Sequence, residues 1–185
     1  EGEEIITCAN PFVIAYDPAT GAERWRAECL SGDVAPTPIY AGGFVFACNI
    51  GAELCAIRPG GQGNVTESAI AWRAMEGMPD TTSPASDGEL LFLAASDGMM
   101  TCYDVKDGTK VWEQYLEAQF RSSPTIVGKR LYVMDTEGVM HVLEVGRAFR
   151  EVATAPLGEP ANSSPAFVGG RVYIRGKSNL YCIGQ

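Results

Sequence analysis

The chain has 185 residues and a formal net charge of −9, and 46% of its residues are hydrophobic. This length and apolar content allow one domain with a sizeable core. The acidic balance disfavours nucleic acid as a partner, because an acidic surface repels phosphate backbones, and no apolar run approaches the ~18 residues that a membrane-spanning helix needs. The 21 Gly and 11 Pro residues, together with the β-branched and aromatic residues, favour an all-β fold.

Residues 3–32 predict three short strands, the last of which carries Trp25 at the end of the phrase YDPATGAERW. Asp17 is expected to accept hydrogen bonds from the backbone N–H groups of the turn beside it. Gly21 is expected to supply the backbone angle that reverses the chain. Trp25 is then expected to lie between adjacent sheets, where its large ring and its indole N–H join one sheet to the next.

Residues 33–77 predict a unit of four short strands, the last of which carries Trp72. Arg58 stands where the first unit has its Asp, and the loop that follows is enlarged to PGGQGNVTESAIA. The Gly-rich segment at 58–63 is expected to be flexible and exposed. Because loops often carry recognition, Arg58 and Gln62 are candidates for contact with a ligand or partner.

Two cysteines of this unit flank a predicted hairpin turn. If Gly51-Ala52 forms a two-residue turn, Cys48 stands directly opposite Cys55 on the neighbouring strand. The same register pairs Ala94 with Thr101 and Met134 with His141. Opposed Cβ atoms lie ~4.5–5.5 Å apart in a sheet, a little long for a disulfide. Two buried free thiols are therefore favoured, and a disulfide is the alternative.

Residues 78–118 predict another unit of four strands and repeat the opening phrase as YDVKDGTKVW. Asp104, Gly108 and Trp112 take the places of the Asp, Gly and Trp in the first copy, and the same three roles are expected of them. The dipeptide Asp97-Gly98 predicts a two-residue type I′ turn between the second and third strands of this unit.

Residues 119–159 predict a further four-stranded unit, and residues 160–185 predict the first three strands of a next one. Glu144 replaces the Asp of the repeated phrase, and Val152 stands where its Trp is expected. This unit and the unit at 33–77 are therefore expected to be joined less rigidly to their neighbours.

The loops that precede the first strand of successive units are expected to gather on one face near a central channel. Arg121 and Asn162 lie in these loops and are weak candidates for binding a ligand or partner. His141, the only His, is expected to be a hydrogen-bonded structural residue. Glu3 and Glu4 are expected to be solvated.

The spacing of Trp and Pro indicates an internal repeat. Trp25, Trp72 and Trp112 lie 47 and 40 residues apart, and Pro38, Pro84, Pro124 and Pro165 lie 46, 40 and 41 residues apart. A β-propeller blade likewise consists of four strands and repeats every ~40–45 residues. We therefore predict a partial all-β propeller of four-stranded antiparallel blades, formed by residues 1–185 as a single domain. Its complete blades are 33–77, 78–118 and 119–159, and its incomplete blades are 3–32 and 160–185.

The repeated phrase resembles the tryptophan-docking motif of pyrroloquinoline quinone (PQQ)-type propeller repeats, in which a Thr-Gly pair precedes a Trp. Thr20-Gly21 and Trp25 match this motif, as do Gly108 and Trp112. The segment IRPGGQGNVTESAIAW and the tail NLYCIGQ are similar to bacterial envelope proteins of this repeat class, which includes the propeller lipoprotein of the outer-membrane β-barrel assembly machinery.

The resemblance implies a ring of seven or eight blades, of which this chain is expected to form the C-terminal half. Its end blades are expected to associate with an N-terminal half or with a second copy, since they present apolar faces and an unpaired strand edge. The expected function is non-catalytic binding or scaffolding in the bacterial periplasm or cell envelope, with protein partners and without a cofactor or metal.

Two alternatives stay open. A PQQ-dependent oxidoreductase would need a calcium site, a catalytic Asp, a Trp that stacks on the quinone and usually adjacent cysteines. The chain has no Cys-Cys pair, and its three Trp residues all occupy docking positions. The other alternative is a sensor domain that binds a sugar or peptide.

Overall fold

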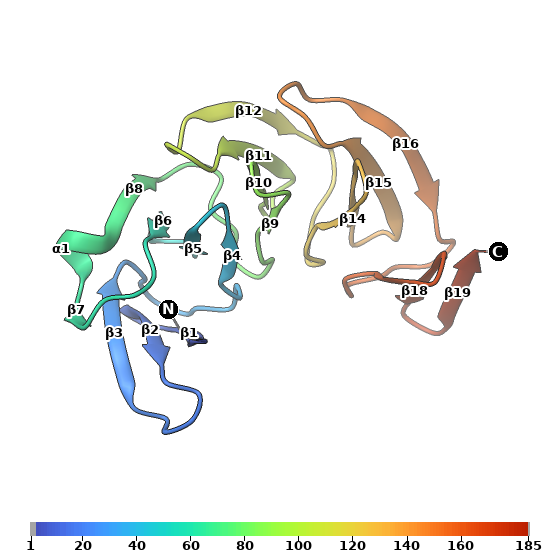
Figure 1. The fold of residues 1–185 in the computed structure, drawn as a ribbon. Coiled ribbons are helices and arrows are strands. Elements are labelled where there is room, and N and C mark those ends of the chain that lie inside the picture. The colour runs from blue at the N-terminus through green and yellow to red at the C-terminus, as the bar shows by residue number, and fades with distance from the viewer. Residues whose placement is uncertain (1–2, 185) are drawn as a thin grey trace.

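The computed structural model of the protein describes residues 3–184, which form five β-sheets arranged as an open arc (Figure 1). We number the sheets I to V along the arc. Sheet I contains β1 (Ile5–Ala9), β2 (Phe12–Tyr16), β3 (Glu23–Glu28) and β7 (Gly63–Asn64). Sheet II contains β4 (Ile39–Ala41), β5 (Phe44–Ala47), β6 (Leu54–Ile57) and β8 (Ile70–Ala74). Sheet III contains β9 (Ala85–Ser86), β10 (Leu90–Ala94), β11 (Met99–Asp104) and β12 (Lys110–Tyr115).

Sheet IV contains β13 (Thr125–Val127), β14 (Arg130–Met134), β15 (Val139–Glu144) and β16 (Glu151–Pro156). Sheet V contains β17 (Ala166–Val168), β18 (Arg171–Arg175) and β19 (Leu180–Gly184). A single turn of helix, α1 (Thr66–Ala69), joins β7 to β8. Figure 1 shows β8, β12 and β16 along the rim of the arc and β4 and β9 toward its centre. The predicted all-β class is confirmed.

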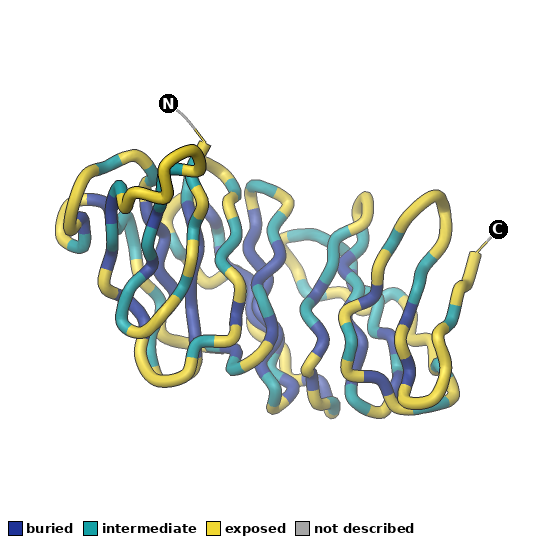
Figure 2. The backbone as a smooth tube through the Cα atoms, turned by 90° about the horizontal axis from the view of Figure 1, so that it is seen from below, coloured by how far each residue is buried: buried dark blue, intermediate teal, exposed yellow. Residues whose placement is uncertain are grey.

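The strands in the middle of the arc bury both of their faces. In β10, all five residues are buried. Leu91 and Leu93 pack in the core shared with sheet II, whereas Leu90 and Phe92 pack in the core shared with sheet IV. Fully burying a Leu or Phe side chain contributes about 1.5–3 kcal/mol, so one strand stabilises two junctions. Figure 2 shows the buried residues along the middle of the strands and the exposed ones mainly at the turns.

Sheet I has a fourth strand that the sequence does not predict. β7 comes from the enlarged loop of sheet II and pairs in parallel with β3, with Gly63 beside Trp25. Val65 donates its N–H to the carbonyl of Arg26 (2.8 Å), and only 6% of Val65 is exposed, in the core between sheets I and II. The segment at 58–63 is largely exposed, as expected, but its end pairs with β3, and burial of Val65 just beyond it fastens the loop to sheet I.

The two-residue turns predicted at Gly51-Ala52 and Asp97-Gly98 are wrong, because the strand register around each differs by one residue from the prediction. A type I′ turn needs positive φ at both central residues, but of the pair Asp97-Gly98 only Gly98 has one, at 100°. Ala95 donates its N–H to the carbonyl of Met99 (2.8 Å), which lengthens the turn. Ala94 consequently pairs with Met100 and not with the residue after it.

This change of register separates the two cysteines of sheet II. Cys55 pairs with Ala47 and not with Cys48, and His141 likewise pairs with Val133. Neighbouring residues of a strand point to opposite faces, so Cys55 belongs to the core between sheets I and II and Cys48 to the core between sheets II and III. The favoured interpretation of free thiols agrees with the structure, in which all six cysteines are free.

A ladder of hydrogen bonds links four sheets just before their first strands. Thr37 donates its N–H to the hydroxyl of Ser83 (2.9 Å), Ser83 donates to that of Ser123 (2.9 Å), and Ser123 donates to that of Ser164 (2.8 Å). Each of these residues precedes a Pro, which favours extended backbone at that position. The hydroxyl before each Pro is visible in the repeat, but its role in joining the sheets emerges only from the structure.

Glu159 holds the hairpin between β18 and β19 in sheet V. Its carboxylate accepts the backbone N–H groups of Ser178 (2.9 Å) and Asn179 (3.0 Å) and the side-chain amide of Asn179 (3.1 Å). Desolvation opposes the ionisation of Glu159, but these hydrogen bonds and one with Tyr181 outweigh it and lower its pKa to about 2.

We expect Glu159→Gln to remove a pH-dependent part of the stability. A carboxyl with a lower pKa in the folded protein than in the unfolded chain stabilises the fold above its unfolded pKa and loses that contribution as the pH falls through its folded pKa. The urea midpoint of the variant should lie below that of the wild type near neutral pH, and the gap should narrow from about pH 5 downward. Exposed Glu137→Gln is the matched control; a gap for Glu159→Gln that stays constant to about pH 3 contradicts the assignment.

Candidate functional site

Two of the three Trp side chains reach from one sheet to the next. Trp72, on β8, donates its indole N–H to the carbonyl of Val105 in sheet III (3.0 Å). Its ring also covers Gly108, where a Cβ atom would lie 2.6 Å from Cε3 of the indole. Trp112, on β12, donates to the carbonyl of Gly146 in sheet IV in the same way (3.0 Å).

The Asp and Gly residues of the repeated phrase shape the turns beside these contacts. Asp17 accepts the backbone N–H groups of Ala19 and Thr20 (2.9 Å each) and pairs with Arg24, and these interactions lower its pKa to about 2. Gly21, in the same turn, has a φ of 71°. Only glycine adopts this region without steric cost.

In the second copy, the Asp also contacts the next sheet. Asp104 accepts the N–H of Lys106 (3.0 Å) and a hydrogen bond from the guanidinium of Arg147 in the following sheet (2.8 Å). Arg147 is the main cause of the lowered pKa of Asp104. Gly108 has a φ of 74°, so its backbone matches that of its counterpart in the first copy.

Trp25 differs from the other two Trp residues in its hydrogen bond. It is fully buried, but its indole N–H points to both carboxylate oxygens of Glu4 within sheet I (3.2 Å each). The expectation that Glu4 is solvated is therefore wrong, since its side chain is only 14% exposed and also lies 3.8 Å from Arg24. The enlarged loop brings Val65 into the core beside Trp25, and Glu4 supplies the acceptor that a carbonyl of the next sheet supplies elsewhere.

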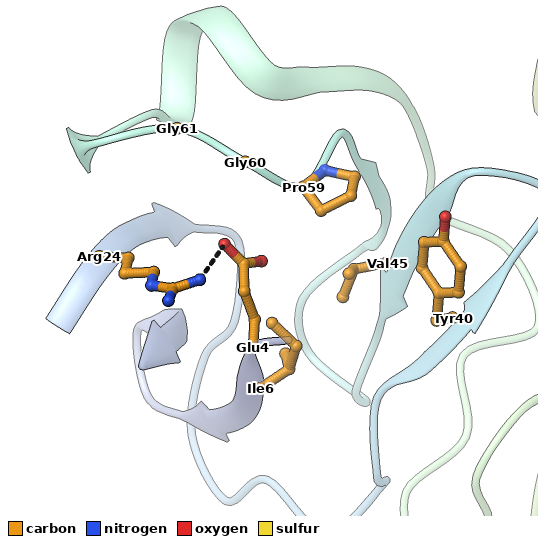
Figure 3. A pocket seen from close by; sticks show the side chains of 8 residues that line it. All are labelled: Glu4, Ile6, Arg24, Tyr40, Val45, Pro59, Gly60 and Gly61. Carbon is orange, nitrogen blue, oxygen red and sulfur yellow. Dashed lines mark ion pairs between the residues drawn. The ribbon is translucent and has the colours of Figure 1, made fainter. Parts of the chain in front are cut away.

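A hollow opens at this first junction, between sheets I and II. Its volume is ≈ 840 Å³. Figure 3 shows Glu4 and Arg24 paired on one side, the side chains of Ile6 and Val45 between the sheets, and the Tyr40 ring on the other side. The backbone at 59–61, from the enlarged loop, closes the hollow along a third side. An aliphatic floor, an aromatic ring and an ion pair therefore meet in one concave surface.

The four weak candidates from the sequence do not line this hollow. Arg58 and Gln62 are exposed on either side of the backbone that does, and the guanidinium of Arg58 lies 5.9 Å from the ring centre of Phe44. Arg121 is exposed before β13. Asn162 is exposed and lines a separate hollow of ≈ 460 Å³ in sheet V. Tyr40, Glu4 and Arg24 are the residues that sequence reasoning misses, because only the fold brings them together.

His141 is held between two carboxylates. Its Nδ1 lies 2.7 Å from Glu151 and its Nε2 lies 3.4 Å from Asp135, while its ring packs edge-on against Phe120. Within residues 3–184, no group of three or more His, Cys, Asp or Glu side chains is arranged to hold a metal ion. In the same part of the chain, no helix has the length and apolar content to cross a membrane.

We expect Gly108→Ala to destabilise the protein more than Gly21→Ala. Both substitutions force an L-residue into left-handed backbone, which costs roughly 1–2 kcal/mol. Only at Gly108 does the new Cβ also collide with the docked Trp72, whereas nothing lies within 4 Å of a Cβ at Gly21; overpacking of this kind costs about 1–3 kcal/mol. Urea unfolding of both variants measures the difference. Equal losses would mean that the indole does not dock on Gly108.

Comparison with known proteins agrees with this fold. The family model described as "Outer membrane protein assembly factor BamB" matches residues 2–66 and 62–179. No curated protein matches the chain. Among solved structures, the chain is similar to BamB from Moraxella catarrhalis, with 18% sequence identity and a TM-score of 0.71; the match covers 98% of this chain and 57% of that chain.

The chain therefore spans little more than half the length of that solved structure, which supports the partial propeller predicted from the sequence. At 18% sequence identity, the similarity between this chain and that structure concerns the fold alone. The family match covers nearly all of the repeats, including both copies of the docking phrase. The chain thus belongs to the BamB family of PQQ-like β-propeller repeat proteins.

Proposed function

We propose that the chain is a non-catalytic binding scaffold of the bacterial cell envelope and that the hollow between sheets I and II receives a segment of a protein partner. The observation that carries this proposal is the ring of Tyr40, which is 67% exposed beside the aliphatic side chains of Ile6 and Val45. Tyr and Arg are enriched among the residues that dominate the energy of protein interfaces. Tyr40 and Arg24 stand on opposite sides of this hollow.

The wall of the hollow is held in position before any partner binds. The loop that carries residues 59–61 is anchored by the pairing of β7 with β3 and by burial of Val65. Thr66 adds a further anchor, because its hydroxyl accepts the N–H of Glu28 (2.9 Å). A preformed wall reduces the entropy that binding must overcome, which supports a role in recognition.

The family relation supports the envelope and the class of partner. The matching family is described as an outer membrane protein assembly factor, so we propose partners that take part in outer-membrane protein assembly and a location in the periplasm or envelope. The end sheets offer further contacts: Ile5 in sheet I and Leu180 in sheet V are 51% and 70% exposed. We propose that these sheets associate with the other half of a ring or with a second copy.

Two other functions compete with the scaffold. A PQQ-dependent oxidoreductase would need a Trp ring for the quinone, but Trp25, Trp72 and Trp112 are engaged between sheets. A sensor domain for a sugar is favoured by the volume of the hollow, since small-molecule sites commonly occupy about 300–1,000 Å³. The exposed ring of Tyr40 at its edge favours a protein segment over a small ligand, because Tyr is enriched among the residues that dominate protein interfaces.

Photo-crosslinking from position 40 tests the scaffold function. A photoreactive residue replaces Tyr40 in one variant and Tyr115 in a second, because Tyr115 is similarly exposed, at 55%, but lies on β12 away from the hollow. In extract from a bacterial envelope, we expect position 40 to crosslink a protein of outer-membrane assembly and position 115 not to do so. Val45→Asp, which puts a charge in the floor, should abolish the crosslink.

Three outcomes contradict the proposal. Equal crosslinking from positions 40 and 115 would mean that the hollow is not the contact. Crosslinks only to a second copy of the chain would assign the hollow to self-association. Oxidoreductase activity after addition of PQQ and calcium would support the enzyme instead.

A further inference from the structure

The junction between sheets IV and V lacks the Trp that the other junctions have. In sheets I to III, the docking Trp pairs with a small residue of the neighbouring strand: Trp25 with Ala15, Trp72 with Ala56 and Trp112 with Cys102. In sheet IV the same register pairs Ala153 with Val142. Ala153 therefore stands in the place of the Trp, and not Val152, which is the unpaired residue of a β-bulge.

A hollow of ≈ 430 Å³ opens at this junction. Its apolar and aromatic lining comes from both sheets and consists of Val127, Tyr132, Phe167, Val168, Val172 and Ile183. Val168 is 65% exposed and Ile183 is 50% exposed. We call this surface the end hollow. Concave apolar surface that solvent reaches often marks a site of interaction.

The walls of the end hollow correspond to those that hold an indole elsewhere in the arc. The ring of Trp72 packs between Phe46 of its own sheet (5.5 Å between ring centres) and Tyr103 of the next sheet (6.4 Å). Tyr132 holds in sheet IV the register position that Phe46 holds in sheet II. Ile183 holds in sheet V the position that Tyr103 holds in sheet III. The end hollow thus presents the two walls of an indole site without a Trp of this chain between them.

Two positive charges lie beside the end hollow. Arg171 lines it, and Lys129 follows Val127 in the adjacent turn of sheet IV. Both side chains belong to exposed residues, and within residues 3–184 neither forms an ion pair, whereas the neighbouring Arg130 pairs with Glu144. In a chain with a net charge of −9, this local positive charge favours an acidic group over a basic one.

We propose that the end hollow binds a segment of a protein partner that inserts a Trp side chain between sheets IV and V and places an acidic residue beside Arg171 and Lys129. The partner supplies the indole that the chain itself supplies at the other junctions, and the two cations orient the segment. This site is separate from the hollow beside Tyr40, so the proposal does not depend on the function proposed for that hollow.

Nuclear magnetic resonance with a short peptide tests the proposal. The isotope-labelled protein is titrated with acetyl-Gly-Glu-Trp-Glu-Gly-amide. We expect the amide signals of Gly169 and Gly170 to shift, because both residues line the end hollow. The signals of Gly60 and Gly61, which line the hollow beside Tyr40, should stay in place, because the indole position at that junction is filled by buried Trp25.

Two altered peptides separate the apolar contribution from the charged one. The peptide with Ala in place of Trp should leave the signals of Gly169 and Gly170 unshifted. The peptide with Lys in place of both Glu residues should bind several-fold more weakly, since its charges are repelled by Arg171 and Lys129.

Substitutions in the protein assign the binding to the end hollow. Ile183→Asp should abolish the shifts of Gly169 and Gly170, because it puts a charge against the indole. Ile5→Asp is the matched control: Ile5 is similarly exposed, at 51%, but lies in sheet I at the opposite end of the arc. Ala153→Trp should also abolish the shifts, because the chain's own indole then occupies the site.

Four results with the wild-type protein would overturn the proposal, and none of them requires a variant to fold. These are equal shifts with the Trp and Ala peptides, no shift of Gly169 and Gly170 at millimolar peptide, and shifts at Gly60 and Gly61 alone. The fourth is a shift of Gly169 and Gly170 when the protein is concentrated without peptide, which would assign the end hollow to a second copy of the chain.

Discussion

Each sheet in the middle of the arc carries apolar side chains on both faces, so it is stable only when a neighbouring sheet lies against each of them. No residue of β10 is exposed to solvent, and its Leu and Phe side chains pack in two different cores, one on each face. The Trp72 ring then covers a glycine of the next sheet and donates a hydrogen bond to a neighbouring carbonyl. The interaction repeats because every further sheet creates one more apolar face to cover.

The junctions are not equivalent, and the differences coincide with the candidate sites. The second and third junctions use Trp72 and Trp112, and the fourth stacks Tyr132 against Phe167 with 4.7 Å between ring centres. The first junction instead uses β7, Val65 and Glu4. The same enlarged loop that replaces the usual contact also walls the hollow beside Tyr40. A local change in one repeat thus maintains the fold and creates a surface that the other repeats lack.

The repeat made the fold predictable from the sequence, whereas contacts between residues far apart in the sequence could not be predicted. Regular spacing of Trp, Pro and Gly is enough to predict the all-β class and the succession of sheets, since each unit meets the same packing constraint. The register around Cys48 and Cys55 was wrong because one extra turn residue reverses the face of every side chain that follows. The burial of Glu4 and of Val65 could not be read from sequence, because each depends on a partner in another strand or sheet. The sequence did not indicate a binding role for Tyr40, since a lone Tyr in a strand is usually explained by packing alone.

The docking of Trp72 on Gly108 can be observed directly by nuclear magnetic resonance. An indole ring over a glycine shields the glycine Hα protons and moves their signals upfield. The account predicts such a shift for Gly108, with cross-relaxation between its Hα protons and the indole of Trp72, and predicts neither effect for Gly21, which no ring covers. Signals of Gly108 and Gly21 at the same unshifted position would contradict the claim that indole rings join the sheets.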